Sequence, residues 1–190
     1  LHQTFRNFEW LVIDDCSNDN TYELLRKFKE KNAINISLYK NETNLMLAKT
    51  CNKAVEIAHG EFFIFLGHDD ELKTYALQRF SEIWDSLKDD VKSNLAGMMS
   101  NCVDETGLYV DDQLPKDPIV TDYFDIYYNY KIQGEKCFCY LTQRILEENF
   151  STEDKYVPEN VMLLNISDHY DTYFLNENLR IYHRGHESFS

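Results

Sequence analysis

The feature that most constrains this chain is an apolar run at residues 62–66 that stops abruptly at Gly67, His68, Asp69 and Asp70. Such a run is typical of a strand buried on both faces of a parallel sheet. In open α/β sheets, ligands bind just beyond the carboxyl ends of the strands. Adjacent carboxylates at that edge suit a hard divalent cation, which in turn suits a phosphorylated ligand. The alternative is that both acids only begin and cap the helix that follows.

The segments around this run alternate between strand-like and helix-like patterns. Strands are expected at 8–13, 34–39 and 62–66, and amphipathic helices at 21–31, 47–58 and 72–87. An alternation of this kind predicts a parallel sheet with helices packed on it.

The second half of the chain departs from this alternation. Strand-like patterns are expected at 95–103, 134–141 and 171–182, helices at 142–149 and 158–170, and a polar tail at 184–190. Residues 104–130 have an irregular pattern, and we expect a flap that faces the ligand there, because long loops in compact domains are usually functional or mobile. Since no repeat or linker is visible, we predict one α/β domain with a mostly parallel sheet flanked by helices and mixed strands in its C-terminal half.

Composition limits the possible partners. The chain has 190 residues and a net charge of −14, which argues against nucleic acid because phosphate backbones need basic patches. Its five cysteines form no pair of CxxC motifs, so we expect Cys137 and Cys139 to be small buried residues in a reducing, cytoplasmic protein. No apolar stretch approaches the ~20 residues that a membrane-spanning helix needs.

Polar residues follow all three expected strands of the first half: Asp14 and Asp15, then Asn44, then Asp69 and Asp70. In this setting, QTFRNFEWLVIDDCSNDNT at 3–21 and NLMLAKTCNKAVEIAHGEFFIFLGHDDEL at 44–72 resemble the motifs of family-2 inverting glycosyltransferases of the GT-A fold. The resemblance is dense and in the same order over the first 72 residues. It implies a nucleotide-sugar half at 1–90 and an acceptor half at 91–190.

The resemblance implies a role for each matching position. Asp15 matches the acid that hydrogen-bonds the nucleotide base, with Asp14 as its supporting neighbour, and Asn44 lies in the same donor site. Asp69 matches the position that holds Mg²⁺ or Mn²⁺ on the diphosphate of the donor, which is expected to be a UDP-sugar. The remaining positions of this donor site are Asp70, which orients the metal site or caps the next helix, and Lys49, which adds charge near the diphosphate. The alternatives are capping of the next helix by the loop acids Asp14 and Asp15, and a solvated helix face for Lys49.

The later match is looser and concerns the acceptor half. Residues 156–159 (YVPE) look like the segment that begins a helix in bacterial members, and Glu159 falls where the family keeps its general base. An ordinary first-turn glutamate is the alternative, and Glu153 and Asp154 are other candidates for the base. The tail at 182–190 resembles a terminal motif in which His186 and Ser188 approach the diphosphate or metal; a surface histidine is equally compatible with the pattern.

Two departures from the family pattern stand out. Gly67 occupies the position where many members have the first Asp of a DxD motif. The family also begins with a strand and a helix that precede the first residue here, so we expect an N-terminally truncated domain. Without that strand, the strand at 8–13 would have an uncovered edge.

The favoured hypothesis is a metal-dependent, inverting transfer of a sugar from a nucleotide donor to a hydroxyl of a glycan or lipid-linked acceptor. Family members commonly work at the inner face of the bacterial membrane, which implies a cytoplasmic protein with peripheral membrane association. A non-catalytic, truncated domain is the first alternative. A Mg²⁺-dependent nucleotidyltransferase is the second, although it would need a basic, glycine-rich phosphate loop.

Overall fold

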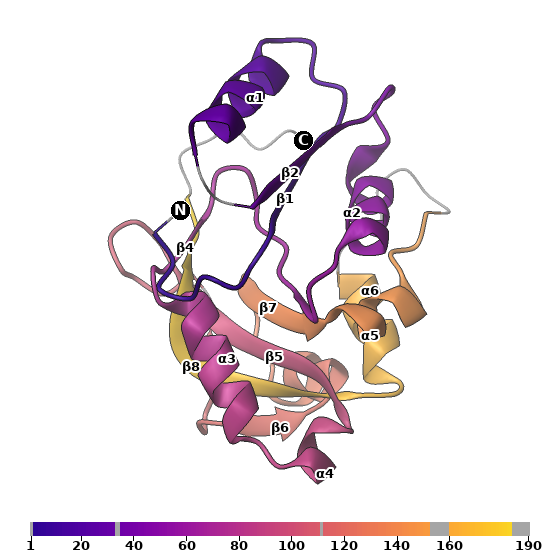
Figure 1. Cartoon of the computed structure of the whole chain (residues 1–190). Helices are drawn as coiled ribbons and strands as arrows, with labels where there is room; N and C mark the ends of the chain where they lie inside the picture. Colours follow the sequence, from indigo (N-terminus) through magenta and orange to yellow (C-terminus); the bar gives the residue numbers. More distant parts are fainter. Residues whose placement is uncertain (1, 33–34, 111, 153–159, 184–190) are drawn as a thin grey trace.

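The computed structural model describes residues 2–32, 35–110, 112–152 and 160–183 (Figure 1). The elements in chain order are β1 (Trp10–Asp14), α1 (Thr21–Lys31), β2 (Ile36–Lys40), α2 (Met46–Ile57), β3 (Phe62–Phe63), β4 (Glu71–Leu72), α3 (Ala76–Ser86), α4 (Asp89–Lys92), β5 (Leu95–Val103), β6 (Ile119–Thr121), the π-helix η1 (Asp125–Asn129), β7 (Lys136–Leu141), α5 (Thr142–Glu148), α6 (Asn160–Ser167) and β8 (Asp171–Ile181). None of the helices in these ranges combines the length and apolar character needed to cross a bilayer.

A six-stranded sheet forms the centre of the fold. Its strand order is β3-β7-β5-β8-β4, and β6 pairs with β8 beside this path. Strand β5 is central, since it pairs with β7 on one edge and β8 on the other. It is buried along its whole length, and its side chains pack into the core clusters on both faces of the sheet. The pairing of β5 with β8 is parallel, whereas β3–β7, β5–β7, β4–β8 and β6–β8 are antiparallel.

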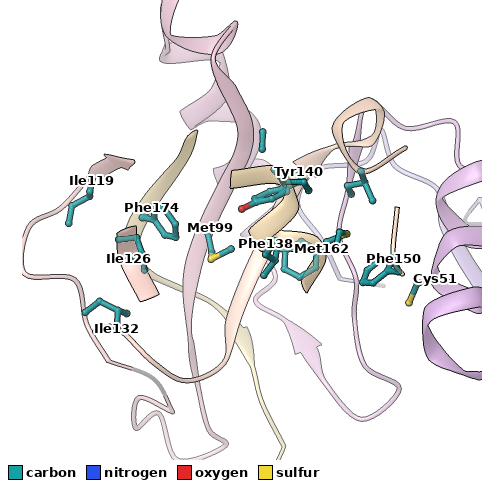
Figure 2. Close-up of a cluster of buried hydrophobic side chains, with 14 of the residues drawn as sticks. Cys51, Met99, Ile119, Ile126, Ile132, Phe138, Tyr140, Phe150, Met162 and Phe174 are labelled. Carbon is teal, nitrogen blue, oxygen red and sulfur yellow. The ribbon is translucent and has the colours of Figure 1, made fainter. Parts of the chain in front are cut away.

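Helices cover both faces of this sheet. The α3 side chains Ala76, Phe80 and Ile83 pack on one face against a core cluster that includes Cys137 and Cys139. Helices α2, α5 and α6 pack on the other face, in the cluster drawn in Figure 2. The α/β fold class is therefore confirmed, as is the expected burial of the two cysteines.

The predicted strand directions need correction. The first two expected strands pair in parallel as β1 and β2, but among the described residues they form a sheet of their own. Figure 1 shows them with α1, set apart from the larger sheet. The third expected strand instead pairs antiparallel with β7, through Phe62 and Phe63. The sheet is thus mixed, and not mostly parallel.

The apolar run at residues 62–66 also forms a shorter strand than the sequence predicts. Only Phe62 and Phe63 are in β3, and the run is half-buried, with Leu66 exposed. The side chains do alternate: Phe62 and Ile64 pack on the α3 side, whereas Phe63 and Phe65 pack on the other side. The run therefore lies between the two hydrophobic clusters and contributes side chains to both. Its side chains are half-buried, so the predicted full burial on both faces is wrong.

The irregular segment 104–130 contains β6 and η1, and the Asn176 side chain binds it to β8. The Asn176 amide donates to the Leu114 carbonyl at 3.0 Å and accepts from the Leu114 N–H at 2.8 Å. The Asn176 N–H in turn donates to the Asp117 carboxylate at 3.0 Å. These contacts attach the middle of the segment to the sheet. A flap that faces the ligand stays a prediction.

Side chains from the N-terminal segment link it to distant parts of the backbone. The Gln3 amide donates to the Lys73 carbonyl at 2.8 Å and accepts from the Leu77 N–H at 3.2 Å. The Glu9 carboxylate accepts from the N–H groups of His59 at 2.6 Å and Gly60 at 3.3 Å. The turn that leads into β3 is therefore held by a residue directly before β1.

Glu9 makes a testable contribution to acid stability. Burial alone would raise the pKa of Glu9, but the hydrogen bonds and charge of His59 and the bond from Gly60 lower it below its ordinary value of 4.5. Its stabilising effect is therefore present above that value and is lost as pH falls through the lowered pKa. We expect Glu9→Gln to cost about 1 kcal/mol at pH 7 and to flatten the decline of melting temperature between pH 5 and 3.

Glu30→Gln is the matched control, because Glu30 is 60% exposed in a surface ion pair with Arg26 and such pairs contribute little. Thermal unfolding followed by circular dichroism across this pH range makes the comparison. Parallel pH profiles for Glu9→Gln and the unsubstituted protein would contradict the role of Glu9.

Candidate functional site

A hollow of about 450 Å³ opens where the turn before β4 meets the end of β8. Its lining residues are Gly67, Asp69, Asp70, Glu135, Asn160, Arg180 and Tyr182. The structure thus brings the predicted metal-site acids together with residues that lie 65 to 113 positions further along the chain. Asn160, at the start of α6, forms part of the same wall.

Asp70 is held by protein groups on both carboxylate oxygens. Arg180 donates to Asp70 Oδ2 from Nε at 3.0 Å and also from Nη2, and the His183 N–H donates to Oδ1 at 3.1 Å. The Asp70 side chain is 2% exposed and that of Arg180 is 12% exposed. A buried carboxylate satisfied in this way acts as a structural anchor between β4 and β8.

Asp69 is in a different environment, although it is the next residue in the chain. Its side chain is 27% exposed, and the ring of His68 lies 3.8 Å from Oδ1. Carboxylate oxygen is a hard ligand, and Mg²⁺ is usually held by one or two carboxylates together with substrate phosphates and water. The open Asp69 carboxylate fits such an ion. Among the described residues, no three His, Cys, Asp or Glu side chains are grouped as a complete metal site.

The alternative role for these two acids, capping the next helix, is wrong. Helix α3 begins at Ala76, five residues after the β4 residue Glu71, and its N-cap position is Tyr75. The Leu77 N–H in its first turn is satisfied by Gln3. Asp69 and Asp70 are separated from the helix by β4, so they contribute to the hollow instead.

A second group of polar residues lies where β1 and β2 end. The Asp14 side chain is 1% exposed, accepts from the Ser17 N–H at 3.0 Å and lies 3.3 Å from Lys40 Nζ. Burial alone would raise the pKa of Asp14, but the bonds from Ser17 and Lys40 lower it. Asp14 therefore holds the loop after β1. It does not cap α1, whose first N–H, on Thr21, donates to Asp19 at 2.9 Å.

Asp15 is oriented by the start of α2. Its Oδ1 accepts from the Asn41 side-chain amide at 2.7 Å and from the Leu45 N–H at 2.9 Å. In the described part of the chain, Asp15 Oδ2 has no hydrogen-bond partner. Asn44 contributes to the same helix start, because its side chain accepts from the Met46 N–H at 3.0 Å. One oxygen of Asp15 is thus fixed while the other is available to a ligand.

The other predicted positions are less informative. Lys49 is exposed on α2, which fits both of its proposed roles. Glu159 and His186, with the further candidates Glu153, Asp154 and Ser188, lie outside the described residues. Their roles stay predictions.

Sequence reasoning missed several residues of the hollow and of the polar site at the ends of β1 and β2. Asn41 directly follows β2, so the rule that pointed to Asp15 and Asn44 could have found it. Arg180 gave no such signal, because it lies within a strand and its partner is 110 positions away. Met46, at the start of α2, was missed too, and it has a positive φ of 67°. A left-handed conformation costs a non-glycine residue about 1–2 kcal/mol.

Comparisons with known proteins are consistent with this arrangement. The model of the family "Glycosyl transferase family 2" matches residues 1–147. The poly(ribitol-phosphate) beta-N-acetylglucosaminyltransferase TarS of Staphylococcus aureus is 34% identical over 85 residues, 44% of this chain and 14% of TarS. The Escherichia coli UDP-Glc:alpha-D-GlcNAc-diphosphoundecaprenol beta-1,3-glucosyltransferase WfaP is 37% identical over 70 residues, 37% of this chain and 27% of WfaP.

Among solved structures, the crystal structure of S. aureus TarS 1–349 in complex with UDP has a TM-score of 0.73 and 21% identity. The superposition covers 96% of this chain and 53% of that one. At this identity the likeness concerns the fold. The chain spans only 14% and 27% of the lengths of the two sequence relatives.

The cysteines provide a direct check on the site and the core. Cys16, next to Asp15, is partly exposed, whereas Cys51, Cys102, Cys137 and Cys139 are buried. Burial raises the pKa of the Cys137 thiol to about 12, and protonated buried thiols react slowly. We expect a thiol reagent such as DTNB to modify Cys16 rapidly in the native protein and all five cysteines after denaturation.

Cys16→Ser should abolish the rapid phase of labelling in the native protein. After denaturation, the variant should have four reactive thiols in place of five. A rapid phase from two or more thiols in the native protein would contradict the described burial of the core.

Proposed function

The chain belongs to glycosyl transferase family 2, and on that basis we propose that it transfers a sugar from a nucleotide donor to an acceptor hydroxyl. The donor is a UDP-sugar, and the acceptor is a glycan or lipid-linked glycan. Two comparisons support this choice: TarS has been crystallised with UDP, and the name of WfaP specifies UDP-Glc and a diphosphoundecaprenol-linked sugar.

The negative charge of the hollow is the main observation that supports a metal-dependent reaction. Its described lining contains three carboxylates, on Asp69, Asp70 and Glu135, and one guanidinium, on Arg180, that is already paired with Asp70. A diphosphate entering this lining would meet uncompensated negative charge. A divalent cation held by Asp69 would offset the negative charge of this lining. When bound, it also stabilises the charge that develops on the departing diphosphate.

The nucleotide end of the donor fits the polar side chains at the ends of β1 and β2. Uracil presents an N–H donor between two carbonyl acceptors. Asp15 Oδ2 can accept from that N–H, while Asn41 and Leu45 keep the carboxylate oriented through Oδ1. Asn44 supports the same helix start, and Lys49 and His186 are assigned to the diphosphate end.

Glu159 is proposed as the general base of an inverting displacement. The acceptor oxygen attacks the anomeric carbon, the bond from that carbon to the diphosphate breaks, and the acceptor proton passes to the Glu159 carboxylate. In the sequence Glu159 directly precedes the described start of α6 at Asn160, which lines the hollow. A helix N-terminus favours the ionised carboxylate that a base requires.

A non-catalytic domain that binds the donor without turning it over is the second candidate. Gly67 is the observation that favours it, since the position lacks the carboxylate present in many family members. Nucleotidyl transfer is not retained, because membership of the family points to sugar transfer. In the favoured proposal, the reaction takes place at the cytoplasmic face of a bacterial membrane.

Ligand binding can be tested by thermal unfolding. With UDP and Mn²⁺ at about 100 times the dissociation constant, binding adds about 2.7 kcal/mol to the free energy of unfolding, a rise of roughly 5–10 °C for a chain of this size. We expect Asp69→Ala to abolish the rise and His68→Ala, at an 83% exposed neighbour, to keep it. UDP should also slow the labelling of Cys16.

If no nucleoside diphosphate raises the melting temperature in the presence of Mn²⁺ or Mg²⁺, the assignment of the donor site is wrong. A rise that persists in Asp69→Ala would remove Asp69 as the metal ligand.

The base can be tested by rates of UDP release from UDP-sugars. General base catalysis contributes about 10²–10⁴-fold, so Glu159→Gln should slow transfer at least 100-fold while the UDP-dependent rise in melting temperature is kept. Glu153→Gln and Asp154→Asn are matched controls with the same loss of charge. An unchanged rate in Glu159→Gln together with a large loss in either control would transfer the role to that residue.

A further inference from the structure

The turn that carries Asp69 and Asp70 has no space for a side chain at residue 67. A Cβ atom on Gly67 would lie 2.8 Å from Asp70 Oδ2 and 2.9 Å from Asp69 Oδ1, closer than Cβ atoms approach other atoms in proteins. The backbone does not require glycine here, because the φ of Gly67 is outside the left-handed region. Both carboxylates instead fold back over Gly67 and fill the space of the missing side chain.

The two carboxylates differ in whether they can move away. Asp70 Oδ2 accepts from two nitrogens of Arg180, and Oδ1 accepts from the His183 N–H. Arg180 is itself fixed, since its Nη1 donates to the Lys136 carbonyl at 3.4 Å. Moving Asp70 would break these bonds around a side chain that is 2% exposed. Asp69 is open to solvent and can rotate.

We propose that Gly67 is a positioning residue: its missing side chain lets Asp70 fold back onto Arg180 and leaves Asp69 as the one carboxylate of this turn open to a cation. The role towards the cation rests on the function proposed above. A carboxylate at residue 67 would compete with Asp70 for space and add a third negative charge beside Arg180. Restoring the acid found in many family members would therefore weaken the cation site in this chain.

The spatial part of the proposal can be tested without metal. In buffer with EDTA, we expect Gly67→Ala to lower the melting temperature by roughly 3–6 °C. The same substitution should have less than half this effect in an Asp70→Ala/Arg180→Met background, where both members of the ion pair are absent. Removing both partners avoids leaving an unpaired buried charge. His68→Ala, in the same turn, should have equal effects in the two backgrounds.

Equal losses from Gly67→Ala in both backgrounds would overturn the proposal, because the carboxylate of Asp70 would then not be what the new side chain meets. If Gly67→Ala has no effect in the unsubstituted background, the proposal is also wrong. Neither outcome depends on whether the protein binds a nucleotide.

The cation part is tested by titrating Mn²⁺ in the presence of UDP, with free Mn²⁺ measured by electron paramagnetic resonance. We expect Gly67→Asp to weaken Mn²⁺ binding about tenfold or more, and Gly67→Ala to weaken it less. Asp70→Asn should also weaken binding by releasing the turn. Glu177→Gln is its charge-matched control, since Glu177 pairs with Arg79 at a 35% exposed site away from the hollow, and it should leave binding unchanged.

Tighter Mn²⁺ binding by Gly67→Asp would overturn the proposal and indicate that the position can supply a ligand. If the unsubstituted protein binds no Mn²⁺ with UDP, the proposed function fails. The unfolding experiment still decides whether Gly67 positions the two acids.

Discussion

The buried ion pair of Asp70 and Arg180 is the interaction on which the candidate site depends. It joins the turn before β4 to the end of β8, and through the His183 N–H it also fixes the chain that leaves the sheet. Removing one partner of such a pair costs about 3–5 kcal/mol, because the other charge is left buried and unpaired. The pair thus sets the wall of the hollow and determines which of two adjacent acids stays accessible.

The family motif in the first part of the chain reflects assembly as much as chemistry. Gln3 and Glu9 are motif residues, yet their side chains bind backbone groups 50 to 74 positions away and join the N-terminal segment to α3 and to the turn before β3. Asp14 likewise holds its own loop. Of the two adjacent acids at the end of β1, Asp14 is almost fully buried, whereas Asp15 keeps one oxygen without a partner among the described residues. Sequence similarity alone does not separate these roles, whereas burial and hydrogen bonding do.

Much of the fold could be predicted because it depends on local patterns. The strand at 95–103 has the predicted bounds, and the ends of β1 and β2 carry the polar residues expected there. The pairing of β3 with β7 could not be predicted from the sequence, since the paired residues lie 77 and 79 positions apart and pairing depends on competition among all strands. The predicted start of α3 is wrong for a related reason: Leu72 fits the helical pattern, but it lies in β4 and pairs with Arg180 of β8.

The separation of Asp69 from Asp70 also bears on how the proposed diphosphate donor would bind to an acidic chain. With Arg180 already neutralised by Asp70, the described lining of the hollow provides no spare positive charge. In the proposed function, the donor and the cation therefore depend on each other, because each supplies charge that the other requires. Thermodynamic linkage makes this dependence reciprocal: UDP should tighten cation binding by the same factor as the cation tightens UDP binding. If Arg180 had no acidic partner, its own positive charge could bind the diphosphate, and UDP binding would depend less on the cation.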